Sequence, residues 1–192
     1  ANLKEEFGLG QDAIIAGFAG RPEEQKGITT LLDAMSLVVP RNDKITLVMA
    51  GEGPLRDSIN TYCRDRHLDR NIVLAGFRED IPAFMKAIDF LVMPSNWEGF
   101  GYAAAEAMAA GKPVIATNVS SLPEIVQAGT TGILVPPRTP QKLAEAMLAL
   151  ANDEELRESL GRAGARRAKE TFPLSAMLDK VESLFRSVLL PS

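Results

Sequence analysis

Short, nearly continuous apolar runs alternate with longer stretches of mixed character along the first 135 residues. The runs are Ala13–Phe18, Ile45–Ala50, Ile72–Ala75, Phe90–Met93, Val114–Thr117 and Ile133–Val135. A strand that is covered by helices on both faces of a parallel sheet is apolar along its whole length, not only at every second residue. The six runs therefore predict the buried strands of a mainly parallel, six-stranded sheet.

The stretches between the runs have helical periodicity. Apolar residues recur at intervals of three and four at Leu31, Leu32, Met35, Val38 and Val39. The more polar stretch Pro54–His67 predicts a half-exposed helix, and a short helix is expected at Ala1–Phe7. This alternation of strands and helices is typical of a Rossmann-like, doubly wound α/β fold, in which helices flank the sheet.

Beyond Val135 the pattern becomes helical to the end of the chain. Helices are expected over about 141–150 and 153–169, and a further one after Pro173. That last helix carries an apolar stripe at Leu174, Met177, Leu178, Val181, Leu184, Phe185 and Val188. The stripe either packs against the sheet or meets a domain outside these residues. We expect one domain over 1–192, with a sheet core at about 13–135 and C-terminal helices at about 140–190.

Composition and charge narrow the classes of function. Hydrophobic residues make up 46% of the 192 residues and charged residues 24%, which favours a folded globular domain over a disordered one. The net charge of −4 argues against a broad nucleic-acid-binding surface, although local cations can still serve one anionic ligand. The single cysteine, Cys63, allows no internal disulfide. With no apolar run of about 20 residues and no secretory leader, a cytoplasmic location is expected.

The segment 89–117 carries the clearest candidate chemistry. It is read as a strand, a glycine-rich loop, a short helix and another strand. Gly99 and Gly101 allow the backbone around Phe100 to approach a ligand closely. The helix that is expected to start near Tyr102 directs its free N–H groups and its partial positive charge toward this loop. Such an arrangement is suited to a phosphate group.

Two carboxylates flank this predicted anion site. Glu98 lies in the loop, and Glu106 lies about one turn into the helix. A carboxylate repels phosphate, so each is better placed to accept hydrogen bonds from hydroxyl groups on either side of one. A sugar nucleotide has this layout. Taken singly, Glu106 reads as a solvated helix residue and Glu98 as a charge at a helix N-terminus, whereas the pair with its glycine spacing favours ligand binding.

Two cations follow the first predicted strand. Arg21 and Lys26, each beside a glycine (Gly20 and Gly27), lie just beyond Ala13–Phe18. Ligands of open α/β sheets bind at the carboxyl ends of strands, where these side chains can reach phosphate oxygens. Gly51 lies after the second strand, where it either approaches the ligand through its backbone or forms a plain turn. No residue cluster has metal-ligand spacing, so a metal-independent site is expected.

The chain resembles the family-4 retaining glycosyltransferases of the GT-B fold. Glu98-Gly-Phe-Gly and the later Glu106, separated by seven residues, resemble that family's paired-glutamate motif. Further similarities follow in the family's order, at Gly20-Arg21, Lys26-Gly27, Val48–Pro54, Val73–Phe77, Pro123-Glu124, Gly129 and Gly132. The chain departs from the pattern at Ser120-Ser121, where paired glycines are expected.

The resemblance implies a donor-binding, C-terminal half of such an enzyme. Arg21 and Lys26 would stabilise the departing diphosphate, Glu98 would orient the sugar, and Glu106 would hold the ribose. Phe77 and Arg78 would contact the nucleobase through their backbone. The expected donor-binding set is Gly20, Arg21, Lys26, Gly51, Phe77, Arg78, Glu98, Gly99, Phe100, Gly101 and Glu106. The substrate would be a nucleoside diphosphate sugar such as a UDP- or GDP-sugar, with no further cofactor.

The same resemblance implies a role for the full-length protein. It would transfer a sugar to a hydroxyl acceptor with retention of anomeric configuration, in cell-envelope polysaccharide, lipopolysaccharide or glycolipid synthesis. The N-terminal acceptor domain would lie outside these residues, so this piece alone would bind nucleotide without turnover. Contact with the inner face of the membrane would come through the full-length protein. The alternatives are a non-catalytic nucleotide-binding scaffold and another GT-B enzyme, such as a sugar-nucleotide epimerase or a phosphorylase.

Overall fold

The computed structural model describes residues 2–173, 178, 181–183 and 185–186. Six strands form one sheet in the order β3-β2-β1-β4-β5-β6, with every pairing parallel. The strands are β1 Ile14–Ala19, β2 Ile45–Ala50, β3 Ile72–Gly76, β4 Phe90–Met93, β5 Val114–Thr117 and β6 Gly132–Val135. Three have the predicted bounds, β3 and β6 differ from prediction by one residue at one end, and β1 is shifted by one residue at both ends. The predicted Rossmann-like α/β fold is confirmed.

Helices connect the strands and complete the chain. They are α1 Leu3–Glu6, α2 Ile28–Val38, α3 Arg56–Arg66, α4 Ile81–Ala87, α5 Tyr102–Ala109, α6 Leu122–Ile125, α7 Pro140–Asn152 and α8 Glu154–Thr171, with a 3-10 turn η1 at Glu24–Lys26. The pattern did not reveal α4, α6 or η1. These elements have seven, four and three residues, too few for a periodic apolar face to emerge.

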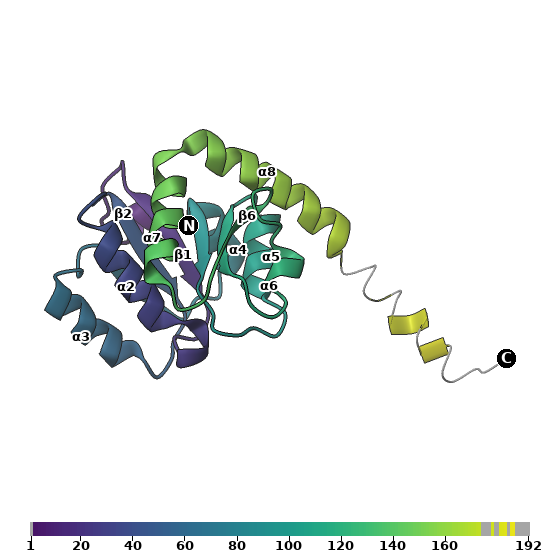
Figure 1. Cartoon of the computed structure of the whole chain (residues 1–192), viewed down its shortest axis with the longest axis horizontal. Coiled ribbons are helices and arrows are strands. Elements are labelled where there is room, and N and C mark those ends of the chain that lie inside the picture. Colours follow the sequence, from purple (N-terminus) through teal and green to yellow (C-terminus); the bar gives the residue numbers. More distant parts are fainter. Residues whose placement is uncertain (1, 174–177, 179–180, 184, 187–192) are drawn as a thin grey trace.

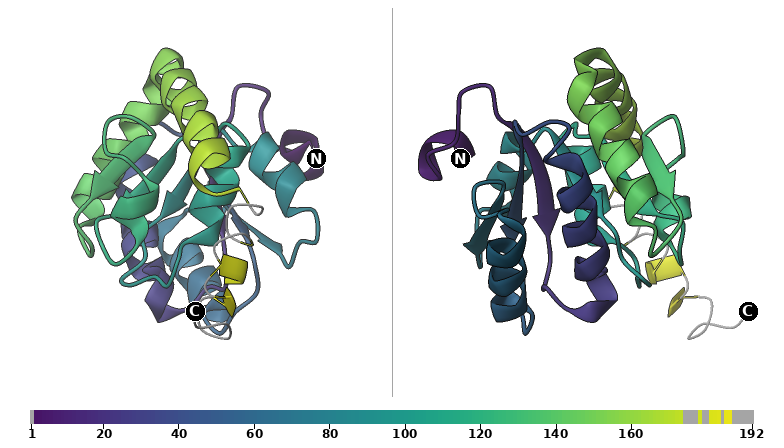
Figure 2. Two further views of the ribbon diagram at one scale, coloured as in Figure 1. Left: turned by 90° about the vertical axis from the view of Figure 1, so that its right-hand side faces the viewer. Right: turned by 60° about the vertical axis from the view of Figure 1, so that its left-hand side comes forward.

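The helices form two layers, one on each face of the sheet. Helices α2, α3 and α7 contribute buried side chains to one apolar core, while α1, α4, α5 and α6 contribute to the other. Successive strand residues alternate between the cores, so Ile15 faces one core and Ala16 the other. Helix α2 lies beside α7 (Figure 1), and α8 contacts both α7 and α5. Figure 2 shows α1 at the margin of the domain, joined to β1 by an extended loop.

The strand order creates a switch point beside β1. The chain runs outward from β1 through β2 to β3, and then returns to place β4 on the other side of β1. Parallel pairing of Ala16 with Phe90 and of Gly17 with Leu91 fixes this junction. The loops that follow β1 and β4 therefore emerge side by side at the carboxyl edge of the sheet. This is the position at which open α/β sheets bind ligands.

The predicted C-terminal apolar stripe falls largely outside the described residues. Of its members, Leu178, Val181 and Phe185 are described, and all three are exposed. Among the described residues, none of the helices has both the length and the apolar character to cross a membrane.

Candidate functional site

An ion pair between Lys26 and Glu98 lies at the switch point. Lys26 Nζ is 2.8 Å from Glu98 Oε2 and 3.0 Å from Oε1, so the ammonium group donates to both carboxylate oxygens. Both side chains are largely buried, with 18% and 9% of their surface exposed. Ser95 Oγ also donates to Glu98 Oε2, at 3.1 Å. The loops after β1 and β4 are thus joined by a charged contact that sequence reasoning did not anticipate.

A cavity of about 310 Å³ opens beside this ion pair. Its lining residues come from the ends of β1 and β4 and from the first turns of α4 and α5: Ala19, Gly20, Lys26, Ile81, Met93, Glu98, Gly101, Tyr102, Ala103 and Glu106. Five predicted site residues, Gly20, Lys26, Glu98, Gly101 and Glu106, are therefore brought together in one cavity. The cavity is framed by a cation, two carboxylates and the start of a helix.

A second cavity, also of about 310 Å³, adjoins the first. It is lined by Gly20, Arg21, Ala50, Gly51, Glu52, Phe77, Arg78 and Ile81, so the two cavities share Gly20 and Ile81. Four further predicted residues, Arg21, Gly51, Phe77 and Arg78, lie here, at the ends of β1, β2 and β3. Phe77 is 70% exposed, which leaves its ring free to cover a ligand. The two cavities together form an elongated site along the sheet edge.

Arg21 and Lys26 differ in how firmly they are held. The Arg21 side chain is 67% exposed, and its Nε lies 3.8 Å from Glu23, a contact that is too long for a hydrogen bond. Lys26 is fixed by Glu98, as described above. Only Lys26 therefore has a preset position, while the guanidinium of Arg21 can move toward a ligand.

Arg78 has a structural role that sequence reasoning missed. Its guanidinium donates to Asp80 through Nε and a terminal nitrogen, both at 2.8 Å, and to Glu6 at 2.6 and 3.2 Å. Hydrogen bonding to Asp80, and then to Glu6, raises the pKa of Arg78. The side chain thus ties α1 to the loop before α4. Of Arg78, only the backbone therefore remains available for a base, whereas the ring of Phe77 is exposed.

The turn at Gly51 is required by close packing. A Cβ atom on this residue would lie 2.0 Å from the carbonyl oxygen of Gly20, and its φ of +136° is unfavourable for other residues. Gly51 also lines the second cavity. The tight turn is therefore established, and it brings the ends of β1 and β2 together beneath that cavity.

The loop between Glu98 and α5 presents backbone to the first cavity. Gly101 precedes α5 and lines the cavity, while Gly99 and Phe100 line neither cavity. The ring of Phe100 instead packs against Tyr102 and Phe172, with centroids 4.9 and 5.8 Å apart. The first N–H groups of α5 have no acceptor within the helix, so this end of the cavity favours an anion.

Glu106 lies one turn into α5, on the wall of the first cavity. Its residue surface is largely exposed, but the carboxyl group is partly desolvated, and this desolvation raises its pKa. A carboxyl group in such a position is poorly solvated when it is ionised. It therefore gains from any hydroxyl group that donates a hydrogen bond to it.

We expect Glu106→Gln to unfold at a slightly higher temperature than the wild-type chain at pH 7. Because the pKa of Glu106 is higher in the folded than in the unfolded chain, ionisation disfavours folding, and the amide removes this cost. Below the unfolded-state pKa of about 4.3, the wild-type carboxyl is protonated in both states and the difference disappears. Thermal unfolding between about pH 3.5 and 8 measures this. If the two unfolding temperatures differed by the same amount at every pH, ionisation of Glu106 would not be the cause.

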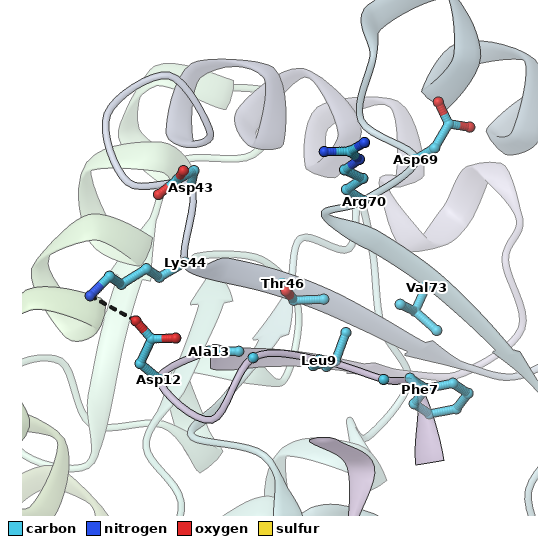
Figure 3. Close-up of a pocket in the computed structure, with 12 residues that line it drawn as sticks. Phe7, Leu9, Asp12, Ala13, Asp43, Lys44, Thr46, Asp69, Arg70 and Val73 are labelled. Carbon is cyan, nitrogen blue, oxygen red and sulfur yellow. Dashed lines mark ion pairs between the residues drawn. The ribbon is translucent and has the colours of Figure 1, made fainter. Parts of the chain in front are cut away.

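Another cavity, larger than the two described above, lies at the opposite edge of the sheet (Figure 3). It measures about 600 Å³ and is formed by the segment after α1 and by the starts of β1, β2 and β3. Its charged pair Asp12–Lys44, 2.9 Å apart, lies in solvent, and Lys44 lowers the pKa of Asp12. None of the predicted site residues lines this cavity. The switch-point cavities are therefore the candidate site.

Several reactive or aromatic residues lie outside the site. Burial raises the pKa of the Cys63 thiol to about 11, which leaves it unreactive near neutral pH. His67 caps the C-terminus of α3 in a left-handed conformation. Trp97 is 60% exposed and lines neither cavity, so it is a surface residue and not a core residue. Among the described residues, no three His, Cys, Asp or Glu side chains form a group suited to a metal ion.

Two polar residues near the site escaped the sequence analysis. Ser95 follows β4 and donates to Glu98, and Gln25 Nε2 donates to the carbonyl oxygen of Trp97 at 3.2 Å. Ser95 is 1% exposed, and a small polar residue directly after a buried strand is a signal that could have identified it. Gln25 lies on η1, which has no comparable signal.

Comparison with known proteins identifies a matching family and similar structures. The family model described as glycosyl transferases group 1 matches residues 1–167. Alpha-D-kanosaminyltransferase of Streptomyces kanamyceticus is 32% identical over 191 residues, which cover 98% of this chain and 49% of the relative. The chain spans about half the length of the curated relatives that it matches.

Two solved structures are informative for the candidate site. Anabaena Alr3699/HepE in complex with UDP superposes with a TM-score of 0.89 at 25% identity, covering 96% of this chain and 51% of the other. The C-terminal domain of the glycosyl transferase group 1 family protein LpcC from Francisella tularensis superposes with a TM-score of 0.80 at 29% identity. That match covers 88% of this chain and 91% of the other.

Proposed function

The chain belongs to the glycosyl transferases group 1 family, and from this premise we propose that it is the donor-binding, C-terminal half of a retaining GT-B glycosyltransferase. The full-length protein transfers a sugar from a nucleoside diphosphate sugar to a hydroxyl acceptor. The similar length and fold of the LpcC C-terminal domain support the assignment to this half. The UDP complex of HepE supports a nucleotide donor, with a UDP- or GDP-sugar as the candidate class.

The observation that carries the proposal is the meeting of Lys26, Glu98 and the start of α5 around one cavity. An ammonium group has three donors. Two are directed to the oxygens of Glu98, which leaves at least one for a phosphate oxygen. The free N–H groups at the start of α5 approach from the other side. Together with the exposed guanidinium of Arg21, they stabilise negative charge on a departing diphosphate.

The two glutamates then contact hydroxyl groups and are not acid–base partners. Both oxygens of Glu98 accept from Lys26, so this carboxylate is a poor nucleophile and is better suited to orienting the donor sugar. Glu106, partly desolvated on the cavity wall, holds the ribose. The adjoining cavity, with the exposed ring of Phe77, takes the base. This arrangement requires no metal ion or other cofactor.

The biological setting follows from the same proposal. Relatives are named for capsular polysaccharide biosynthesis in Staphylococcus aureus and lipopolysaccharide core biosynthesis in Rhizobium meliloti, which supports a role in cell-envelope synthesis. The enzyme would act in the cytoplasm, at the inner face of the membrane where its acceptor requires it. An acceptor-binding N-terminal domain completes the active site, so the 192-residue piece binds the donor without transferring its sugar.

Calorimetric titration of the 192-residue chain with UDP and GDP tests the proposal. We expect one of them to bind, and the matching nucleoside, uridine or guanosine, to bind much more weakly because it lacks the diphosphate. If a folded chain binds neither UDP nor GDP, the proposal is wrong. In the full-length protein, Glu98→Ala and Lys26→Ala should abolish transfer, whereas unchanged activity would favour a non-catalytic scaffold.

A further inference from the structure

The turn after β5 holds the loop Glu98–Gly101, called the donor loop below, through serine hydroxyl groups. Ser121 Oγ donates to the carbonyl oxygen of Phe100 at 2.9 Å, and the N–H of Glu98 donates to Ser120 Oγ at 3.3 Å. Deeper in the fold, Thr117 Oγ1 donates to the carbonyl oxygen of Ser95 at 2.6 Å. Three side-chain hydroxyl groups from one segment therefore fix the backbone that follows β4.

These contacts determine which way the peptide groups of the loop face. In a trans peptide, the C=O and the following N–H point in opposite directions. Because Ser121 binds the C=O of Phe100, the N–H of Gly101 is turned away from Ser121. The peptide before Glu98 is held at both ends, since its C=O accepts from Gln25 and its N–H donates to Ser120. The loop is thereby preorganised, which reduces the entropy lost when a ligand orders it.

The backbone conformation of Ser120 is unfavourable for a residue that has a side chain. Its φ is +50°, in the left-handed region that is uncommon for residues other than glycine. Such conformations are destabilising and are concentrated at functional positions. A glycine would adopt the same turn without strain but would offer no hydroxyl group to Glu98. Compared with a glycine, Ser120 therefore destabilises the turn but adds a hydrogen bond to the donor loop.

We propose that Ser120 and Ser121 are positioning residues of the donor site, which hold the Glu98–Gly101 loop so that the backbone N–H of Gly101 faces the bound diphosphate. This inference rests on the proposed function, because it takes the ligand to be a nucleoside diphosphate. The serines themselves need not contact the ligand. They act through Glu98 and Phe100.

The test compares nucleotide affinity with stability in four variants of the 192-residue chain. Ser121→Ala removes one anchor, Ser121→Thr keeps the hydroxyl group, and Ser120→Gly removes the other anchor while relieving the positive φ. Ser36→Ala, which also loses a hydroxyl contact to a backbone carbonyl but lies on α2, is the matched control. Calorimetry with UDP and GDP gives the affinity, and thermal unfolding gives the stability.

We expect Ser121→Ala and Ser120→Gly each to weaken nucleotide binding by about 3- to 10-fold, as the loss of one hydrogen bond would. Ser121→Thr should restore wild-type affinity, and Ser36→Ala should not change it. Ser120→Gly should unfold at a temperature no lower than the wild type, which a purely structural role would not produce. Unchanged affinity in both Ser121→Ala and Ser120→Gly would overturn the inference. A wild-type chain that binds neither nucleotide would instead refute the proposed function on which it rests.

Discussion

Lys26→Met should lower the affinity for UDP or GDP by at least about 100-fold and the free energy of unfolding by about 3 kcal/mol. The substitution leaves the Glu98 carboxylate, only 9% exposed, without the ammonium group that compensates it. Ser95 alone cannot replace a cation. The uncompensated negative charge then opposes both folding and the approach of a diphosphate. Urea unfolding and calorimetric titration measure the two effects separately.

Two further variants separate the causes of this loss. Combining Lys26→Met with Glu98→Gln removes the stranded charge, so stability should largely return while nucleotide affinity should not. Lys44→Met breaks an ion pair whose side chains are 57% and 68% exposed, far from the site, and should change neither stability nor affinity appreciably. Full affinity in the Lys26→Met variant would exclude Lys26 from contact with phosphate.

The strands could be predicted from the sequence because a parallel strand that is buried on both faces is a nearly continuous apolar run. β2, β4 and β5 are nearly continuous apolar runs, and their predicted bounds hold to the residue. Short connecting elements have no comparable pattern of apolar residues. Helix α4 has only seven residues, about two turns, so tertiary packing of Phe84 and Met85 stabilises it more than its own periodicity does.

The composition of the site was predictable, but its pairing was not. Strand ends followed by glycines and charges identified Gly20, Lys26, Glu98 and Gly101, and the structure brings all four to one cavity. That Lys26 pairs with Glu98, 72 residues away, depends on the adjacency of β1 and β4. The strand order is a property of the whole sheet, and neither residue's local sequence encodes it.

Side-chain hydrogen bonds between residues that are far apart in the sequence could not be predicted either. Arg78 reads locally as a base-loop residue, yet Glu6, 72 residues earlier, helps to fix its guanidinium. Ser120 and Ser121 read as a departure from a glycine pair, and only their contacts to Glu98 and Phe100 give that departure a physical meaning. Sequence patterns thus identified segments that line the candidate site, while the three-dimensional contacts show how those segments are held.

Gly27→Ala should be among the most disruptive single-methyl changes at the site. Gly27 joins Lys26 to α2 with φ +66°, and a Cβ atom there would lie 2.0 Å from the carbonyl oxygen of Pro94. No side-chain rotation relieves a clash with backbone, so the loop after β1 must move away from the loop after β4. Because these loops carry Lys26 and Glu98, the ion pair should lengthen and nucleotide affinity should fall with stability.

Gly129→Ala separates the clash from the cost of the backbone conformation. Gly129 has a similar φ of +72°, but a Cβ atom there meets nothing within 4 Å. The left-handed conformation should lower the free energy of unfolding of Gly129→Ala by about 1–2 kcal/mol. Gly27→Ala should lower it by about 1–3 kcal/mol more, because its Cβ atom is overpacked. Urea unfolding compares the two, and titration with UDP or GDP should show weakened binding for Gly27→Ala alone. Equal destabilisation with equal affinity would mean that the close approach of Gly27 to Pro94 does not hold the two loops together.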